Sequence, residues 1–185
     1  MSTVVYNAEQ IETALQAMSE SIHTARDDAP WAIVGIRRGG EHLANRIAEL
    51  LSERTGTTIP VGYVDITLYR DDGFGPNDWP AVGVTEIPFE LKKYTVVLVD
   101  DVLYTGRTVR AAIDAIIDYG RPLAIRLATL VDRGLRELPI QADTVGFQLE
   151  TAPNQEVNVT LVARGDNADL VTLGPRGNGD PKETS

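Results

Sequence analysis

Residues 96–108 constrain the fold of this chain more than any other segment. They read Val-Val-Leu-Val-Asp-Asp-Val-Leu-Tyr-Thr-Gly-Arg-Thr. The unbroken apolar run at the start is typical of a strand that is buried on both faces of a parallel sheet. Behind the glycine-containing turn, apolar residues recur at helical spacing from Val109 to Ile117. This order of strand, turn and helix predicts an α/β fold with a ligand site at the carboxyl edge of the sheet.

The same segment brings together two kinds of polar group. Asp100 and Asp101 directly follow the apolar run. Gly106 permits a tight turn, and the free N–H groups of the next helix, with the hydroxyls of Thr105 and Thr108, form a phosphate cradle. Acids beside an anion site suit a sugar phosphate, because carboxylates accept hydrogen bonds from ribose hydroxyls. The alternative, in which the acids only end a strand and a threonine only caps a helix, is less favoured because strand, acid pair and turn occur together.

The rest of the chain alternates strand and helix patterns. After a short apolar run at Val4–Tyr6, a capping box at Asn7 and Gln10 begins a helix whose apolar residues continue to Ile22. A second helix is predicted to end near Gly56. Strands are predicted at Trp31–Gly35, Val61–Tyr69, Thr95–Val99, Ala124–Val131, Asp143–Phe147 and Val157–Val162. This alternation implies right-handed βαβ units and a mainly parallel central sheet flanked by helices.

Two stretches lack any periodicity. The stretch from Arg70 to Pro88 is dominated by glycine, proline, asparagine and aspartate, and such a stretch is usually a functional lid or a disordered connection. From Gly174 onward the chain consists of glycine, proline and polar residues, which predicts a disordered tail over residues 174–185. A chain of 185 residues suffices for one domain, so we expect a single domain over residues 1–173.

The composition limits which binding partners and which cellular compartment we expect for this chain. The 27 aspartates and glutamates against 17 lysines and arginines give a net charge of -10, which argues against binding nucleic acid or an anionic membrane through overall charge. An anionic ligand must therefore be held by a local arrangement. The absence of cysteine excludes thiolate catalysis and Cys-ligated metal sites. No apolar stretch is long enough for a membrane span and the start lacks a signal peptide, so we expect a cytoplasmic protein without a membrane partner.

Residues 96–108 resemble the phosphoribosyl-pyrophosphate (PRPP) signature of type I phosphoribosyltransferases. The longer string over residues 99–109 is similar to that of the family of bifunctional pyrimidine operon regulators and uracil phosphoribosyltransferases. Further strings match the pattern of that family at residues 65–72, 120–122, 130–134 and 136–140. The resemblance covers residues 4–173 and implies the type I phosphoribosyltransferase fold, with a flexible loop and a small hood beside the central sheet.

The resemblance implies transfer of a phosphoribosyl group from PRPP to uracil, giving UMP and pyrophosphate in nucleotide salvage. Asp100 and Asp101 would hold the ribose hydroxyls near the developing positive charge, and both could contact Mg²⁺ that arrives with the substrate. Backbone groups from Tyr104 to Thr108 would bind the 5′-phosphate. The PRPP-binding segment comprises Val96, Val97, Leu98, Val99, Asp100, Asp101, Val102, Leu103, Tyr104, Thr105, Gly106, Arg107 and Thr108.

The resemblance also places residues around the two other ends of the substrates. Arg37 and Arg38 match the pyrophosphate-binding loop, in which Gly39 stands where the family usually has an arginine. Arg70 begins the flexible loop, which the family closes over the substrates.

The nucleobase end of the site has three candidate residues. Arg133 and Val157 match positions near the base, although Arg133 can equally be structural. Purine phosphoribosyltransferases of this type often carry an aspartate where Tyr104 stands, so its absence favours a pyrimidine. A type I phosphoribosyltransferase for another base stays open as an alternative.

Some family members also bind the messenger RNA of the pyrimidine operon in a UMP-dependent way and thereby promote attenuation. RNA-binding members tend to have hydroxyl, arginine and histidine side chains where this chain has Gln16, Ala17 and Glu20. Leu135 replaces a usual histidine, whereas Arg136 is retained. We hypothesise that the enzyme activity persists while RNA binding is weak, altered or lost. The alternative is a UMP-sensing regulator with vestigial catalysis, and the family resemblance implies a homo-oligomer in either case.

Overall fold

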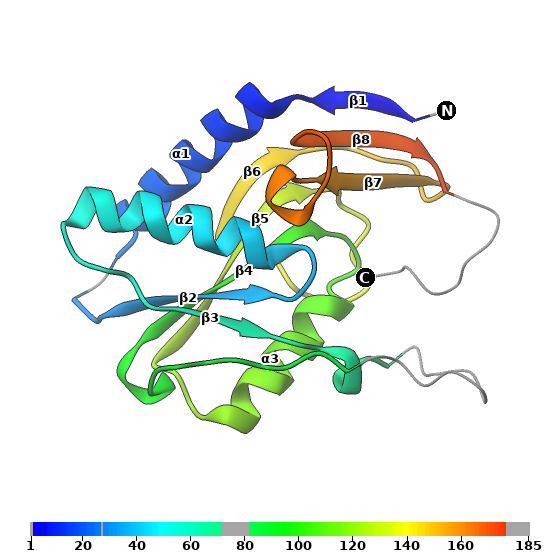
Figure 1. Ribbon diagram of the computed structural model, residues 1–185. Helices are drawn as coiled ribbons and strands as arrows, with labels where there is room; N and C mark the ends of the chain where they lie inside the picture. The colour runs from blue at the N-terminus through cyan, green and yellow to red at the C-terminus, as the bar shows by residue number, and fades with distance from the viewer. Residues whose placement is uncertain (1, 27, 72–81, 177–185) are drawn as a thin grey trace.

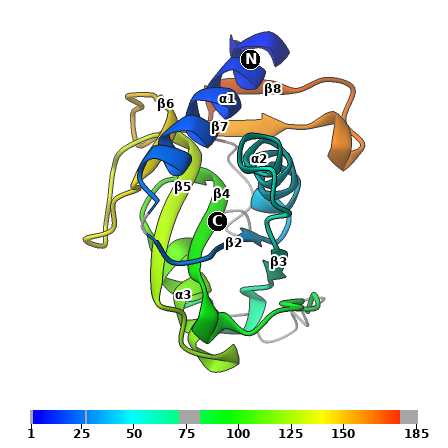
Figure 2. The ribbon, with the colours of Figure 1, turned by 90° about the vertical axis from the view of Figure 1, so that its left-hand side faces the viewer.

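The computed structural model describes residues 2–26, 28–71 and 82–176. Its centre is a five-stranded parallel sheet with the order β3-β2-β4-β5-β6. The strands are β2 (Trp31–Ile36), β3 (Val61–Val64), β4 (Thr95–Leu103), β5 (Ala124–Asp132) and β6 (Thr144–Gln148). Helices α1 (Ala8–Thr24) and α2 (Gly40–Thr55) cover one face, and α3 (Arg107–Tyr119) covers the other (Figures 1 and 2). The predicted α/β architecture is confirmed.

The alternation of side chains along the central strands produces two apolar layers. Ile33, Val97 and Val99 pack under α1 and α2 in one core cluster. Val34 and Leu98, one residue out of phase, pack against α3 in the other cluster. Because successive residues of a strand point to opposite faces, the unbroken apolar run serves both layers at once. This covered sheet gives rigid support to the acid pair at its carboxyl edge.

The helix ends follow the predicted chemistry. The Asn7 side chain accepts a hydrogen bond from the Gln10 N–H, and the Gln10 side chain accepts one from the Asn7 N–H, both at 3.0 Å. Gly56 ends α2 in the left-handed conformation at φ +64, and Gly120 follows the last residue of α3. These ends are local arrangements of backbone and neighbouring side chains, which is why the sequence predicts them well.

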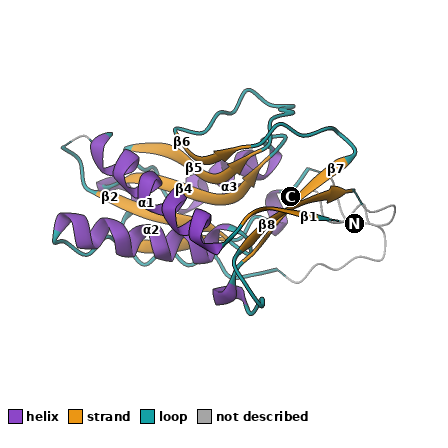
Figure 3. Cartoon of the chain, turned by 90° about the horizontal axis from the view of Figure 1, so that it is seen from above, coloured by secondary structure: helices purple, strands orange, loops and turns teal. Residues whose placement is uncertain are grey.

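A smaller antiparallel sheet lies beside the carboxyl ends of the parallel strands (Figures 1 and 3). It contains β1 (Thr3–Tyr6), β8 (Leu170–Pro175) and β7 (Gln155–Thr160) in the order β1-β8-β7. We call β1, β7, β8 and the residues between β7 and β8 the hood. The hood joins the start of the chain to its end, so no single stretch of sequence contains it.

The predicted domain boundary at residue 173 is too early. Gly174 and Pro175 belong to β8, and the Arg176 N–H donates to the Asn154 carbonyl oxygen at 2.9 Å. Pairing with β7 holds these residues, although their own composition is that of a loop. The rest of the predicted tail, residues 177–185, lies outside the described residues.

The strand predicted at Val61–Tyr69 ends after Val64. The Asp65 carboxylate accepts a hydrogen bond from the Thr67 N–H at 3.0 Å and turns the chain into a 3-10 helix, η1 (Thr67–Tyr69). Such short side-chain bonds compete with strand pairing and end it. Most of the predicted flexible loop, residues 72–81, also lies outside the described residues.

Candidate active site

The acid pair lies where two parallel strands part. The last register pair between β2 and β4 is Gly35 with Val99, whereas β4 and β5 continue to pair as far as Leu103 with Asp132. β4 therefore extends through the acid pair, whereas the sequence predicted a strand that ends at Val99. In an open α/β sheet of this order, the point at which strand order reverses leaves a crevice at the carboxyl ends, and ligands bind there.

Two glycines allow the loop after β2 to approach this edge closely. A Cβ atom on Gly40 would overlap the carbonyl oxygen of Val99, and one on Gly39 would overlap the carboxylate of Asp101. Any larger residue at these positions would need the backbone or the acid to shift. The loop predicted to bind pyrophosphate and the acid pair are thus in direct contact.

The two acids occupy different electrostatic environments. Asp100 is 5% exposed, and its Oδ1 accepts a hydrogen bond from the Asp101 N–H at 3.0 Å. Burial and, after it, the negative charge of Asp101 raise the pKa of Asp100 well above the ordinary range of a carboxyl group. Asp101 is partly exposed and forms an ion pair with Arg164 at 3.2 Å. The arrangement therefore disfavours the ionised form of Asp100.

The carbonyl groups of the turn after β4 are hydrogen-bonded within the protein. The Arg133 N–H donates to the Leu103 carbonyl at 3.1 Å, and Arg136 Nη1 donates to the Tyr104 carbonyl at 2.9 Å. The N–H groups of residues 137 and 138 both donate to the Thr105 carbonyl at 3.0 Å. Because C=O and N–H point in opposite directions across a trans peptide, the next N–H groups face the other way. This is the geometry that an anion-binding turn requires.

A cavity of about 400 Å³ opens over this turn. It is lined by Ile66, Arg70, Asp71, Tyr104, Thr105, Arg107, Thr108, Glu137 and Arg176. Gly106 caps α3 at φ +92, and the first N–H groups of a helix have no acceptor within the helix. The predicted phosphate cradle therefore faces a space large enough for a ligand. Sequence reasoning missed Arg176, because it lies in the segment predicted to be a disordered tail.

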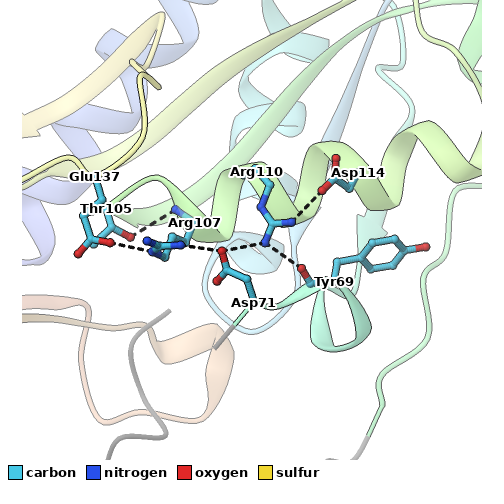
Figure 4. Close-up of polar contacts among 7 residues, drawn as sticks. All are labelled: Tyr69, Asp71, Thr105, Arg107, Arg110, Asp114 and Glu137. Atoms are coloured by element: carbon cyan, nitrogen blue, oxygen red, sulfur yellow. Dashed lines mark hydrogen bonds and ion pairs between the residues drawn. The ribbon is translucent and has the colours of Figure 1, made fainter. Parts of the chain in front are cut away.

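An ion-pair network connects the start of the predicted flexible loop to α3 (Figure 4). Arg107 Nη1 lies 2.7 Å from Asp71 Oδ2, and Arg110 Nη2 lies 3.2 Å from the same oxygen. Arg107 Nε also donates to Glu137 at 2.7 Å. Arg70 lies beside Asp71 on the cavity wall. These contacts hold the described end of the loop against the turn between β4 and α3. We call this turn, residues 104–106, the phosphate turn because it is the predicted phosphate cradle.

In the loop predicted to bind pyrophosphate, the side chain of Arg37 already has protein partners. Its Nε donates to the Val84 carbonyl at 2.5 Å, and its terminal nitrogens pair with Glu41 at 3.3 Å and Glu86 at 3.2 Å. Arg38 is exposed and has a positive φ of 79. In this conformation two carboxylates balance the charge of Arg37.

The two predicted base-site residues are both buried. The Arg133 guanidinium stacks on the Tyr104 ring, 4.0 Å from its centroid, and donates to Thr151 Oγ1 at 3.1 Å and to the Gln155 carbonyl at 2.8 Å. Burial lowers the pKa of Arg133. Val157 packs in the core cluster under α1 and α2. Arg133 thus holds the hood against the turn after β4, and a contact of either residue with a base stays a prediction.

The predicted PRPP segment needs one correction. The side chains of Val96, Val97, Leu98 and Val99 are at most 1% exposed. They form the centre of a sheet that is covered on both faces, so they support the acid pair without reaching a ligand. The part of the signature that can contact a substrate begins at Asp100.

Comparison with known proteins agrees with this geometry. A model of the phosphoribosyl transferase domain matches residues 2–164. The chain belongs to the phosphoribosyltransferase family. It is 47% identical over 173 residues to the bifunctional protein PyrR of Syntrophobacter fumaroxidans, covering 93% of this chain and 92% of the relative. It is 49% identical over 170 residues to PyrR of Geobacter sulfurreducens, covering 91% and 96%. Within the phosphoribosyltransferases, the chain therefore groups with the PyrR proteins.

Solved phosphoribosyltransferase structures share the fold. A hypoxanthine-guanine phosphoribosyltransferase of Bacillus anthracis has a TM-score of 0.68 and 16% identity, covering 91% of this chain and 95% of that one. A hypoxanthine phosphoribosyltransferase of Trypanosoma cruzi also has a TM-score of 0.68 at 16% identity, covering 93% and 91%. At this identity the likeness concerns the fold alone, and it confirms the predicted type I phosphoribosyltransferase architecture.

Proposed function

We propose that this chain is a uracil phosphoribosyltransferase, which joins uracil to PRPP and releases UMP and pyrophosphate. The observation that carries the proposal is the position of Asp101 between the phosphate turn and the loop after β2, in a chain 47–49% identical to PyrR proteins over nine-tenths of its length. The bond between ribose C1 and pyrophosphate breaks with its electron pair on the departing oxygen. Uracil N1 bonds to C1 and its proton is released.

Each part of the crevice has a separate task in this reaction. The N–H groups of the turn before α3 bind the 5′-phosphate, while Asp100 and Asp101 hold the ribose hydroxyls. As pyrophosphate departs, positive charge develops at the anomeric carbon, and the Asp101 carboxylate would lie near that charge. Catalysis then depends on position and charge more than on proton transfer.

The donor set fits Mg²⁺ that is held mainly through the substrate. Within residues 2–26, 28–71 and 82–176, no group of three or more His, Asp or Glu side chains could hold a metal ion. Mg²⁺ commonly binds through one or two carboxylates together with phosphate oxygens, which Asp100, Asp101 and PRPP would supply. When bound, the ion would neutralise charge on the pyrophosphate leaving group.

A panel of nucleobases tests the proposed specificity. The chain is incubated with PRPP and Mg²⁺ and with uracil, hypoxanthine, guanine, adenine or orotate, and the nucleotide product is identified by mass spectrometry. We expect UMP to form at least about tenfold faster than any other product, since one unmatched polar contact in a base site costs about 1–3 kcal/mol. Comparable turnover of a purine would contradict the proposal.

The family resemblance also implies a second role, RNA binding, which we propose to be weak here. Gln16 and Glu20 lie on the exposed side of α1, and Glu20 pairs with Arg54. Arg136, retained from RNA-binding members, has its guanidinium bonded within the protein, to Tyr104 and Asp132. A gel-shift titration with the operon leader, with and without UMP, tests this. Tight binding that depends on UMP would overturn it and would favour the regulator alternative if turnover were also low.

A further inference from the structure

Arg107 is the first residue of α3, directly behind the phosphate turn, and its guanidinium holds two carboxylates (Figure 4). Its Nε donates to Glu137 Oε2 and its Nη1 donates to Asp71 Oδ2, both at 2.7 Å. These two nitrogens lie on the two edges of the guanidinium that can each bind an anion through a pair of N–H groups. Each of these edges therefore already has a protein carboxylate on it.

The two carboxylates lie on the wall of the cavity over the phosphate turn. The same wall carries Arg107 together with Arg70 and Arg176, so three arginines face two acids there. A phosphate held by the turn would lie among these side chains and would compete for the guanidinium that the acids already occupy. Asp71 and Glu137 therefore bind the cation that directly follows the phosphate turn.

The described end of the loop has anchors other than Asp71. The Tyr69 hydroxyl donates to Asp118 Oδ2 at 2.7 Å, and Arg110 Nη2 donates to the Tyr69 carbonyl at 3.1 Å. The side chains of Asp71 and Arg107 are 39% and 47% exposed, so their ion pair lies in contact with water. Exposed pairs of this kind contribute little to stability, and a phosphate with two charges can therefore replace the Asp71 carboxylate at Arg107.

We propose that Asp71 and Glu137 compete with the 5′-phosphate of the substrate for the Arg107 guanidinium, and thereby lower the affinity of the site for phosphoribosyl ligands. The inference rests on the proposed function, because PRPP and UMP are the ligands that carry this phosphate. On binding, the phosphate takes over N–H groups of Arg107 and the carboxylates return to water. A lower affinity shortens the time for which a ligand stays bound, so the two acids favour release of the nucleotide product.

Calorimetric titration with UMP tests the inference through the sign of the effect. We expect Asp71→Asn and Glu137→Gln each to tighten UMP binding about 1.5- to 5-fold, the range of one exposed ion pair. The affinity for uridine, which has no phosphate, should not change. Asp114→Asn is the matched control, because Asp114 pairs with Arg110 as Asp71 does but is not among the residues that line the cavity. It should leave both affinities unchanged.

The same titrations in an Arg107→Gln background show whether the acids act through Arg107. We expect Arg107→Gln to weaken UMP binding by itself, and we expect Asp71→Asn to give no further gain when Arg107 is absent. This result supports the competition, because the carboxylate then has no guanidinium to withhold from the phosphate. If the full gain of Asp71→Asn persisted in the Arg107→Gln background, competition for Arg107 would be overturned.

Ribose 5-phosphate separates this inference from the proposed function, because it carries the ribose and the phosphate without a base. Tighter binding of ribose 5-phosphate by Asp71→Asn supports the competition even if uracil proves not to be the substrate. Unchanged or weaker binding of UMP and ribose 5-phosphate overturns the inference, whether or not the wild-type chain makes UMP. An equal gain for uridine and UMP also overturns it, because the phosphate would then play no part. Glu137→Gln serves as the test if Asp71→Asn fails to fold.

Discussion

Arg136 Nη1 lies 2.9 Å from the carbonyl oxygen of Tyr104, so a side chain from the turn after β5 fixes the peptide that opens the phosphate turn. The same guanidinium donates to the Ile140 carbonyl at 2.9 Å and to Asp132 at 2.5 Å. Arg136 is therefore a positioning residue. It satisfies the Tyr104 carbonyl and so fixes the orientation of the first peptide of the turn.

Replacing Arg136 should weaken PRPP binding more than uracil binding. We expect Arg136→Met to raise the KM for PRPP about tenfold or more, because the Tyr104 carbonyl loses a charged donor and the turn loses its orientation. The KM for uracil should change by less than about threefold. Initial-rate kinetics with each substrate varied in turn give both constants. Arg136→Lys keeps the charge without the forked geometry. If both variants changed the KM for PRPP and the KM for uracil by the same factor, the positioning role would be contradicted.

Asp100 should lower the free energy of unfolding as the pH rises. Its pKa is raised in the folded protein, mainly by burial, so the folded state binds its proton more tightly than the unfolded state does. The contribution of Asp100 to stability is then fully present below about pH 4, the ordinary carboxyl pKa, and is lost as the pH rises toward the raised value. Asp100→Asn removes this ionisation. The variant should be more stable than the wild type at pH 8, and the difference should disappear near pH 4.

Thermal unfolding of both proteins from pH 4 to pH 8 measures this difference. A constant offset between the two unfolding temperatures across the range would show that Asp100 is not the titrating group. The same variant, and Asp101→Asn, should lose turnover at all pH values, because each removes a carboxylate from the ribose site. Full activity of both variants would show that the acids do not hold the ribose.

Gly39 and Gly56 should respond to the same substitution in opposite ways. Gly39→Ala places a methyl group on the Asp101 carboxylate, so we expect turnover to fall at least about tenfold with little change in stability. Gly56→Ala meets open space but keeps a left-handed φ of +64, so it should cost about 1–2 kcal/mol of stability and leave turnover unchanged. Steady-state kinetics and chemical denaturation distinguish the two effects. A loss of activity in Gly56→Ala would show that the contrast is not local to the crevice.

The ring of Tyr104 should matter more than its hydroxyl group. The Arg133 guanidinium lies 4.0 Å from the ring centroid, and such a contact in a partly buried site contributes about 0.5–2 kcal/mol. We expect Tyr104→Leu to raise the KM for uracil about 2- to 30-fold, while Tyr104→Phe stays close to the wild type. Uracil saturation curves at fixed PRPP measure both. Identical behaviour of the two variants would show that stacking on Arg133 does not shape the base site.

The features that were predictable from the sequence are those with short-range causes. The capping box at Asn7, the stop at Gly56 and the turn at Gly106 each depend on residues within a few positions. Residues 96–108 are informative because strand, acids, turn and helix follow one another directly along the chain. The strand predicted to end at Val99 continues to Leu103, because pairing with β5 outlasts the apolar run that marks a strand in sequence.

The sequence by itself therefore determined the α/β class, the turn between β4 and α3, and the acid pair. Tertiary structure alone decided which cation faces that pair. Arg164 is 63 residues from Asp101 and 125 residues from Gly39 along the chain, and no local pattern connects them. They meet because β8 pairs with both β1 and β7 to form the hood, which carries η3 (Val162–Arg164) to the place where β2 and β4 separate. Strand pairing and close packing between distant segments set that contact, and neither leaves a periodic signal in the sequence.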